Sequence, residues 1–155
     1  MKEREKHVLS LAKKIIALLK PYSKKIQIAG SIRRKSENPG DIDIVLIPKN
    51  KSKLENFLSK KGKRILGGEQ KVYFRIEGIE VEIYYTNEEE WGAALLAYSS
   101  RRGSGIGLRI VARLKGFKLT QHGLFSRKTG KRIAGKTEEE IYRALNRPYK
   151  EPWER

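Results

Sequence analysis

Apolar and polar positions follow a helical period at the start of the chain and a strand period after it. Residues 7–20 carry apolar side chains at helical spacing, and Pro21 follows this stretch. Alternating or apolar segments come next, and Gly67-Gly68 and Glu77-Gly78 between them are turn signals. These segments predict a mixed sheet with helices packed on it. The predicted strands lie at 25–29, 41–47, 64–66, 72–76 and 79–84, and a short helix is predicted around 54–58.

A different pattern begins at Asn87. This residue can cap a helix from 88 to about 98, with Glu90 completing a capping box. Residues 101–105 predict a basic turn containing glycine, and apolar residues every fourth position then predict a helix that ends at Gly116. A hairpin follows over about 119–133, and a last helix runs to about 145. We therefore predict an α+β fold with a first half over residues 1–90 and a smaller half of helices and a hairpin over 91–155.

Composition narrows the class of protein. The chain has 155 residues, of which 38% are hydrophobic, so it can bury a core. It has no cysteine, which excludes disulfides, zinc-thiolate sites and thiol catalysis. No apolar run approaches the roughly 20 residues of a membrane span, and the N-terminus lacks the apolar stretch of a secretory signal. We expect a cytoplasmic protein, with no membrane association.

The net charge of the chain indicates which class of partner it binds. The chain has 35 Lys and Arg residues against 18 Asp and Glu residues, a formal net charge of +17, and the basic residues are spread along the whole chain. Such an excess suits a polyanion, because counterion release from nucleic acid supplies affinity without sequence preference. The alternative is a lysine-rich surface adapted to heat or crowding, and charge alone does not separate the two.

Two aspartates carry the clearest chemistry. Asp41 and Asp43 are two positions apart in a predicted strand, so their carboxylates lie on one face, while Ile42 and Ile44 face the core. Paired carboxylates repel each other unless a cation lies between them, and Mg²⁺ prefers oxygen ligands. Taken alone, this D-x-D pattern is also typical of a solvated strand face.

Upstream of the aspartates, the first predicted strand runs into Gly30-Ser31. Free backbone N–H groups at a helix start bind phosphate, and Arg34, one turn further on, adds a charge-assisted contact. A lone Gly-Ser is usually a turn. The joint order of strand, Gly-Ser, basic helix, glycine and acidic strand is much harder to obtain by chance, and it indicates phosphoryl transfer.

This arrangement resembles the nucleotidyltransferase superfamily that includes DNA polymerase β. The downstream half narrows the resemblance to the family X DNA polymerases, and the similarity covers about residue 5 to the C-terminus. The segments that carry it are Glu89-Glu90-Trp91-Gly92-Ala93-Ala94-Leu95-Leu96-Ala97-Tyr98, Leu108-Arg109, Lys115-Gly116-Phe117-Lys118-Leu119, His122-Gly123-Leu124-Phe125, Thr137-Glu138-Glu139-Glu140-Ile141-Tyr142 and Pro148-Tyr149.

The resemblance implies a set of site residues in the first half, which would be the palm-like catalytic subdomain. Asp41 and Asp43 would hold the metal ions, and a third carboxylate would come from the strand at 79–84. Counting back from Trp91 places it at Glu82, with Glu80 as the alternative; both share one side of that strand with Tyr84. The residues expected to bind the nucleoside triphosphate or shape its approach are Gly30, Ser31, Arg34 and Gly40.

The second half would be a nucleotide-binding subdomain. Its sugar-selecting turn reads Ala97-Tyr98-Ser99-Ser100, so Tyr98, Ser99 and Ser100 are expected beside the nucleotide. Arg109 falls where the family has an arginine that contacts the template strand, and Lys71 of the first half falls near the DNA backbone. Arg101, Arg102 and Arg113 cluster near the same half and are further candidates for DNA contact.

The resemblance thus implies a DNA-directed DNA polymerase of family X type that uses two Mg²⁺ ions, with Mn²⁺ as a substitute. Its partners would be primer/template or gapped DNA and a nucleoside triphosphate, in short-gap repair, with both held in the cleft between the halves. We expect a monomer without the lyase and helix-hairpin-helix regions of the family. Two alternatives stay open: a template-independent terminal or RNA nucleotidyltransferase, and a non-catalytic module that binds nucleic acid.

Overall fold

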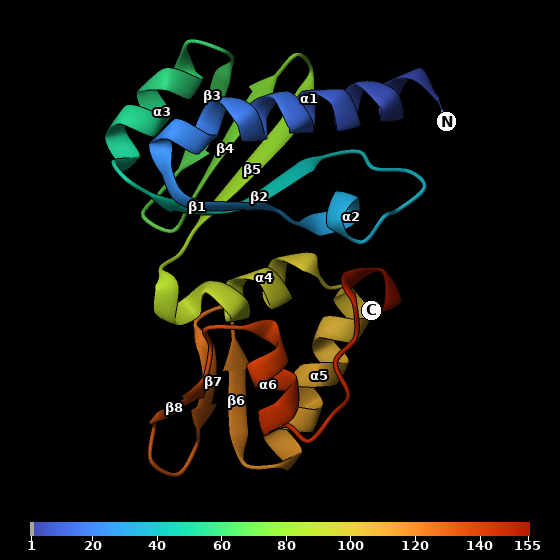
Figure 1. Cartoon of the computed structure of the whole chain (residues 1–155), viewed down its shortest axis with the longest axis vertical. Helices are drawn as coiled ribbons and strands as arrows, with labels where there is room; N and C mark the ends of the chain where they lie inside the picture. The colour runs from blue at the N-terminus through green and yellow to red at the C-terminus, as the bar shows by residue number, and fades with distance from the viewer. Residues whose placement is uncertain (1) are drawn as a thin grey trace. The chain divides into compact units, whose positions relative to one another are not determined.

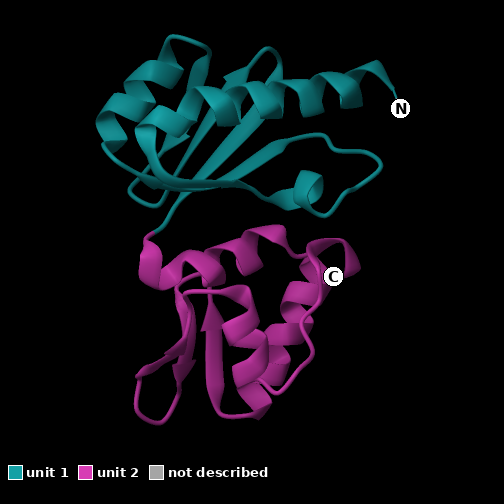
Figure 2. Ribbon diagram, viewed as in Figure 1, with its two compact units in different colours: residues 1–86 teal, residues 87–155 magenta. Residues whose placement is uncertain are grey.

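Two separate hydrophobic cores organise the chain. The computed structural model describes residues 2–155, and it divides them into a first unit that ends at Thr86 and a second unit over residues 87–155 (Figure 2). The sequence pattern predicts this boundary four residues later, between residues 90 and 91. No helix within residues 2–155 is long and apolar enough to cross a membrane.

The first unit is a five-stranded sheet with strand order β1-β2-β5-β4-β3 (Figure 1). The pair β2 and β5 is parallel and the other pairs are antiparallel, which makes the sheet mixed, as the sequence predicts. Its elements are α1 (Glu3–Leu19), a 3₁₀ turn (Lys20–Tyr22), β1 (Ser23–Ile28), α2 (Gly30–Arg33), β2 (Ile42–Pro48), α3 (Lys51–Ser59), β3 (Lys63–Gly67), β4 (Lys71–Ile76) and β5 (Ile79–Tyr85).

One face of this sheet is apolar and buried. Ile42, Ile44 and Phe74 are wholly buried there, and the apolar stripes of α1 and α3 belong to the same core. Because side chains alternate across a strand, the residues between them point to the opposite face. That face carries Asp43 on β2 and Glu82 on β5, so the packing of the core fixes the direction of the acidic side chains.

The second unit packs helices on a three-stranded sheet with order β6-β7-β8. Its core includes Leu124, Ile141 and Leu145, all wholly buried. Gly92 lies so close to the backbone of Thr137 that any side chain would collide with it. The elements are a 3₁₀ turn (Glu88–Glu90), α4 (Trp91–Ser99), α5 (Arg102–Leu114), β6 (Phe117–Thr120), β7 (Gly123–Ser126), β8 (Arg132–Ala134), α6 (Glu138–Ala144) and a final 3₁₀ turn (Pro152–Glu154).

One local expectation for this unit is wrong, and another is incomplete. The basic turn predicted over 101–105 is instead the first turn of α5, which begins at Arg102. Each glycine in a helix costs about 1 kcal/mol, and packing of the opposite helix face around the buried Ala112 offsets this. The predicted hairpin also gains a third strand, because β8 pairs with β7. The apolar stripe that predicted α5 is exposed: Ile106 and Ile110 are each 42% exposed and Leu114 is 79% exposed.

Candidate active site

Asp43 and Glu82 face each other across the only parallel strand pair within residues 2–155. The register of β2 and β5 pairs Asp43 directly with Glu82. Tyr84 lies two residues further along β5, on the same side as Glu82. Its hydroxyl donates a 2.6 Å hydrogen bond to Glu82 Oε2 and a 3.3 Å hydrogen bond to Asp43 Oδ1. The three side chains therefore form one connected group on the polar face of the sheet.

The carboxylates of this group share an unfavourable negative field. Burial raises the pKa of Asp43 to about 8, helped by a hydrogen bond with Glu82 and by the negative charges of Glu82 and Asp41. The pKa of Asp41 is also raised, first by partial burial and then by the charges of Glu80 and Glu82. The charge of Arg4 acts in the opposite direction on the pKa of Asp41 but does not outweigh burial and the two glutamates.

These carboxylates fit a hard divalent cation. Oxygen ligands from carboxylates are what Mg²⁺ prefers, and a cation would neutralise the charge that raises the two aspartate pKa values. Among residues 2–155, no three acidic or histidine side chains are already gathered as the ligands of one metal. Asp43 and Glu82 instead share a hydrogen bond, and Asp41 lies just before β2 begins at Ile42.

The two glutamates considered as the third carboxylate differ in their surroundings. Glu82 lies in register with Asp43, whereas Glu80 lies opposite Arg75 on β4. Glu80 Oε1 is 3.5 Å from Arg75 Nη2, and the Glu80 side chain is 50% exposed. The structure therefore brings Glu82, and not Glu80, beside Asp43.

Gly30 and Ser31 lie against the same aspartate. The backbone N–H of Ala29 donates a 2.8 Å hydrogen bond to the carbonyl of Asp43. Gly30 has a φ of +59°, and a side chain there would collide with the Asp43 carboxylate. Ser31 is half-buried in the first turn of α2, where N–H groups have no partner within the helix. This turn thus places potential phosphate donors next to the acidic group.

Arg34 and Gly40, the other two candidates in this region, have different surroundings. α2 ends at Arg33, so Arg34 is its C-cap and not an interior residue of the helix. Arg34 is half-buried and follows the turn that holds Ser31. A side chain at Gly40 would meet no atom within 4 Å, so nothing in the folded chain itself requires glycine there.

The second unit contains a cavity of about 190 Å³ between α4, α5 and β6. Ser100, Arg101, Arg102 and Arg109 line it, so four candidates from the sequence meet at one place. Ala97 of the predicted turn also lines it, whereas Ser99, which is wholly buried, and Tyr98, which is half-buried, do not.

The remaining basic candidates lie on exposed surfaces. Arg113 is exposed one turn after Arg109 on α5. Lys71, in the first unit, is exposed at the start of β4, and its Nζ lies 5.5 Å from the ring centre of Tyr73. The candidate DNA contacts are therefore divided between the two units.

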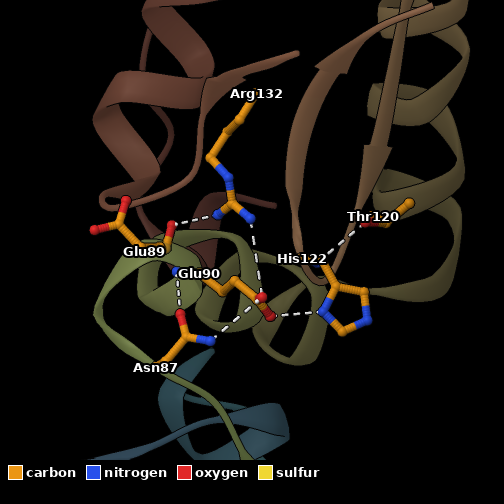
Figure 3. A network of polar contacts seen from close by, with 6 residues as sticks. All are labelled: Asn87, Glu89, Glu90, Thr120, His122 and Arg132. Carbon is orange, nitrogen blue, oxygen red and sulfur yellow. Dashed lines mark hydrogen bonds and ion pairs between the residues drawn. The ribbon is translucent and has the colours of Figure 1, made fainter. Parts of the chain in front are cut away.

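A polar network in the second unit holds the start of α4 to the small sheet (Figure 3). His122 Nδ1 lies 2.6 Å from Glu90 Oε1, and Arg132 donates a 2.9 Å hydrogen bond to the carbonyl of Glu89. Arg132 Nη2 also lies 3.9 Å from Glu90 Oε2. The sequence shows Glu90 only as a helix cap, because its partners are distant in the chain. Asn87 accepts the cap bond from the Glu90 N–H, as predicted.

Comparison with known proteins gives two results. Residues 94–155 match the family described as DNA polymerase beta thumb. The chain is 29% identical over 150 residues to repair DNA polymerase X of African swine fever virus (strain Badajoz 1971 Vero-adapted), covering 89% of this chain and 85% of the viral protein. The protein of the same name from the isolate Warthog/Namibia/Wart80/1980 is 28% identical over 148 residues, with the same coverage.

Proposed function

Because this chain belongs to the family X DNA polymerases, we propose that it is a DNA-directed DNA polymerase that extends a primer 3′-hydroxyl in short-gap repair. The observation that carries this proposal is the pairing of Asp43 with Glu82 next to the Gly30-Ser31 turn. Acidic side chains beside phosphate donors are the arrangement that nucleotidyl transfer requires.

In this proposal Asp41, Asp43 and Glu82 hold two Mg²⁺ ions, with Mn²⁺ as a substitute. Bound divalent cations would supply charge neutralisation at the phosphates and would lower the pKa of the attacking hydroxyl. The raised pKa values of Asp41 and Asp43 support this role, because burial and then the neighbouring carboxylates disfavour their charged forms, and a bound cation would favour those forms.

The protein groups then have separate tasks. The N–H groups at Gly30-Ser31 and the guanidinium of Arg34 bind the triphosphate and stabilise the departing pyrophosphate. The primer hydroxyl attacks the α-phosphate in line with the leaving pyrophosphate, and the carboxylate of Glu82 helps to remove its proton. Gly40, which has open space around it, leaves room for the nucleotide to approach.

The second unit supplies the nucleotide and DNA contacts. Tyr98, Ser99 and Ser100 would lie beside the incoming nucleotide. Arg101 and Arg102, which line the cavity with Ser100, would contact the DNA. Arg109, Arg113 and Lys71 would contact the DNA backbone, and the net charge of +17 supports binding to a polyanion. We propose that one copy of the chain performs the reaction.

Primer extension tests the function. The wild-type protein is incubated with Mg²⁺ and either gapped, nicked or single-stranded DNA, and with deoxy- or ribonucleotides. The proposal expects template-directed extension on gapped DNA, and Asp41→Ala is expected to abolish it. Glu69→Gln is the matched control, because it removes an exposed carboxylate from the turn between β3 and β4, outside the acidic group.

The same assay separates the alternatives. Extension of single-stranded DNA without a template would identify a terminal transferase, and a preference for ribonucleotides and RNA ends would identify an RNA nucleotidyltransferase. DNA binding with no Mg²⁺-dependent turnover would identify a non-catalytic module. Extension by Asp41→Ala at the wild-type rate would overturn the active-site assignment.

A further inference from the structure

We propose that Tyr84 is a positioning residue that fixes the carboxylate of Glu82 beside Asp43, so that this glutamate serves as the third metal ligand. The inference rests on the proposed function. It assigns a role to a side chain that holds two of the acidic residues at once, through hydrogen bonds of 2.6 Å to Glu82 and 3.3 Å to Asp43.

The length of glutamate makes such a restraint necessary. Glu82 has one more methylene, and one more rotatable bond, than an aspartate such as Asp43. A longer carboxylate loses more rotamer freedom when it is held in one position, and this loss opposes metal binding. A short hydrogen bond to a carboxylate is among the stronger kinds, and the Tyr84 hydroxyl makes one before any cation arrives.

The two hydrogen bonds are unequal, and the difference indicates which acid is held. The bond to Glu82 is shorter by 0.7 Å (3.3 minus 2.6) than the bond to Asp43. The phenol of Tyr84 is itself fixed, because this residue is only 9% exposed on a central strand. Tyr84 therefore tethers Glu82 firmly, while Asp43 can turn toward a cation by giving up its weaker bond.

The neighbouring residues supply two comparisons. Glu80, on the same face of β5, is paired with Arg75 and half exposed. Tyr85 is the next residue on the strand, and its hydroxyl donates a 2.8 Å hydrogen bond to Glu55 Oε2 on α3. Tyr85→Phe thus removes a similar tyrosine-to-glutamate bond from the same strand without affecting the acidic group, which makes it a matched control.

Metal binding gives the first test. Mn²⁺ is titrated into wild type, Tyr84→Phe and Tyr85→Phe without DNA or nucleotide, and free Mn²⁺ is measured by electron paramagnetic resonance. Loss of an outer residue that orients a ligand weakens metal affinity by about 10-fold to 100-fold. We expect a loss in this range for Tyr84→Phe and an unchanged affinity for Tyr85→Phe. Equal affinity in wild type and Tyr84→Phe would overturn the proposal.

A double-mutant cycle separates positioning from general structural support. In Glu82→Asp the shorter carboxylate no longer needs the tether, so adding Tyr84→Phe is expected to leave Mn²⁺ affinity unchanged. A merely structural tyrosine would cause the same loss in both backgrounds, and that result would overturn the inference. Thermal unfolding in EDTA establishes that each variant is folded.

The outcomes also distinguish this inference from the function on which it rests. A wild-type protein that extends primers, together with a Tyr84→Phe variant of unchanged metal affinity, overturns the inference alone. A wild-type protein that neither binds Mn²⁺ nor extends a primer overturns the polymerase function, and the inference with it.

Discussion

The guanidinium of Arg155, the last residue of the sequence, donates a 2.7 Å hydrogen bond from Nη1 to Glu138 Oε2 at the start of α6. Both side chains are buried, at 1% and 5% exposure. The guanidinium also lies 5.8 Å from the ring centre of Tyr142 and 5.6 Å from that of Tyr149. This ion pair joins the end of the chain to the core of the second unit.

Breaking that pair from one side is expected to destabilise the second unit. Arg155→Ala removes this positive charge from the buried Glu138 carboxylate, and breaking a buried ion pair from one side costs about 3–5 kcal/mol in comparable pairs. Urea unfolding followed by far-UV circular dichroism measures the loss. The double variant Arg155→Met/Glu138→Leu should recover most of it, because it removes both charges. A single variant as stable as wild type would show that the pair contributes nothing.

Asp43→Asn is expected to inactivate the enzyme. It removes the charge of a proposed metal ligand, and metal ions bound there would contribute several kcal/mol to the transition state, so kcat should fall by about 10²–10⁴-fold. Single-turnover extension of a gapped substrate measures this fall. An extension rate near that of wild type would remove Asp43 from the catalytic assignment.

The same variant should change how stability depends on pH. The pKa of Asp43 in the folded, metal-free protein is raised from 3.8 to about 8, so its stabilising proton is present at low pH and lost as pH rises through about 8. Wild type in EDTA should therefore lose more stability than Asp43→Asn between mildly acidic and mildly alkaline pH. Melting temperatures across this range give the comparison, and parallel curves for the two proteins would contradict it.

Gly30→Ala is expected to impair both stability and activity. The new alanine would have to keep the positive φ of Gly30, and its side chain would collide with the Asp43 carboxylate. Gly78→Ala is the matched control, since Gly78 has a φ of +77° with no atom within 4 Å of the added carbon. Both variants should lose about 1–2 kcal/mol from backbone strain, but only Gly30→Ala should also lose most primer extension. Equal activity in the two variants would show that the collision is harmless.

DNA binding is expected to weaken steeply with salt. Arg109→Ala and Arg113→Ala should each lower the slope of log affinity against log salt by about one, because each would remove one of the proposed phosphate contacts. Lys128→Ala, an exposed basic residue between β7 and β8, is the control and should leave the slope unchanged. Fluorescence anisotropy with a gapped oligonucleotide gives the slopes. A flat salt dependence in wild type would rule out electrostatic binding.

Several parts of the fold follow from local sequence alone. The period of apolar residues predicts α1, and alternation predicts the strands of the first unit, because each segment needs only one apolar face. Thr137 and Glu140 form the capping box that opens α6, as predicted from their spacing. In contrast, the start of α5 at Arg102 was not predicted, since its glycines are typical of turns and only packing keeps them helical.

The sequence by itself determined that Asp41 and Asp43 follow a Gly-Ser turn, and that Glu80, Glu82 and Tyr84 share one side of a later strand. Only the tertiary structure decided that β5 lies beside β2 in a register that brings Glu82, and not Glu80, to Asp43. It alone showed that Tyr84 contacts both acids, and that Arg155 is buried against Glu138. The physical reason is that local periodicity sets which face a side chain occupies, whereas strand order and register depend on packing between segments distant in the chain.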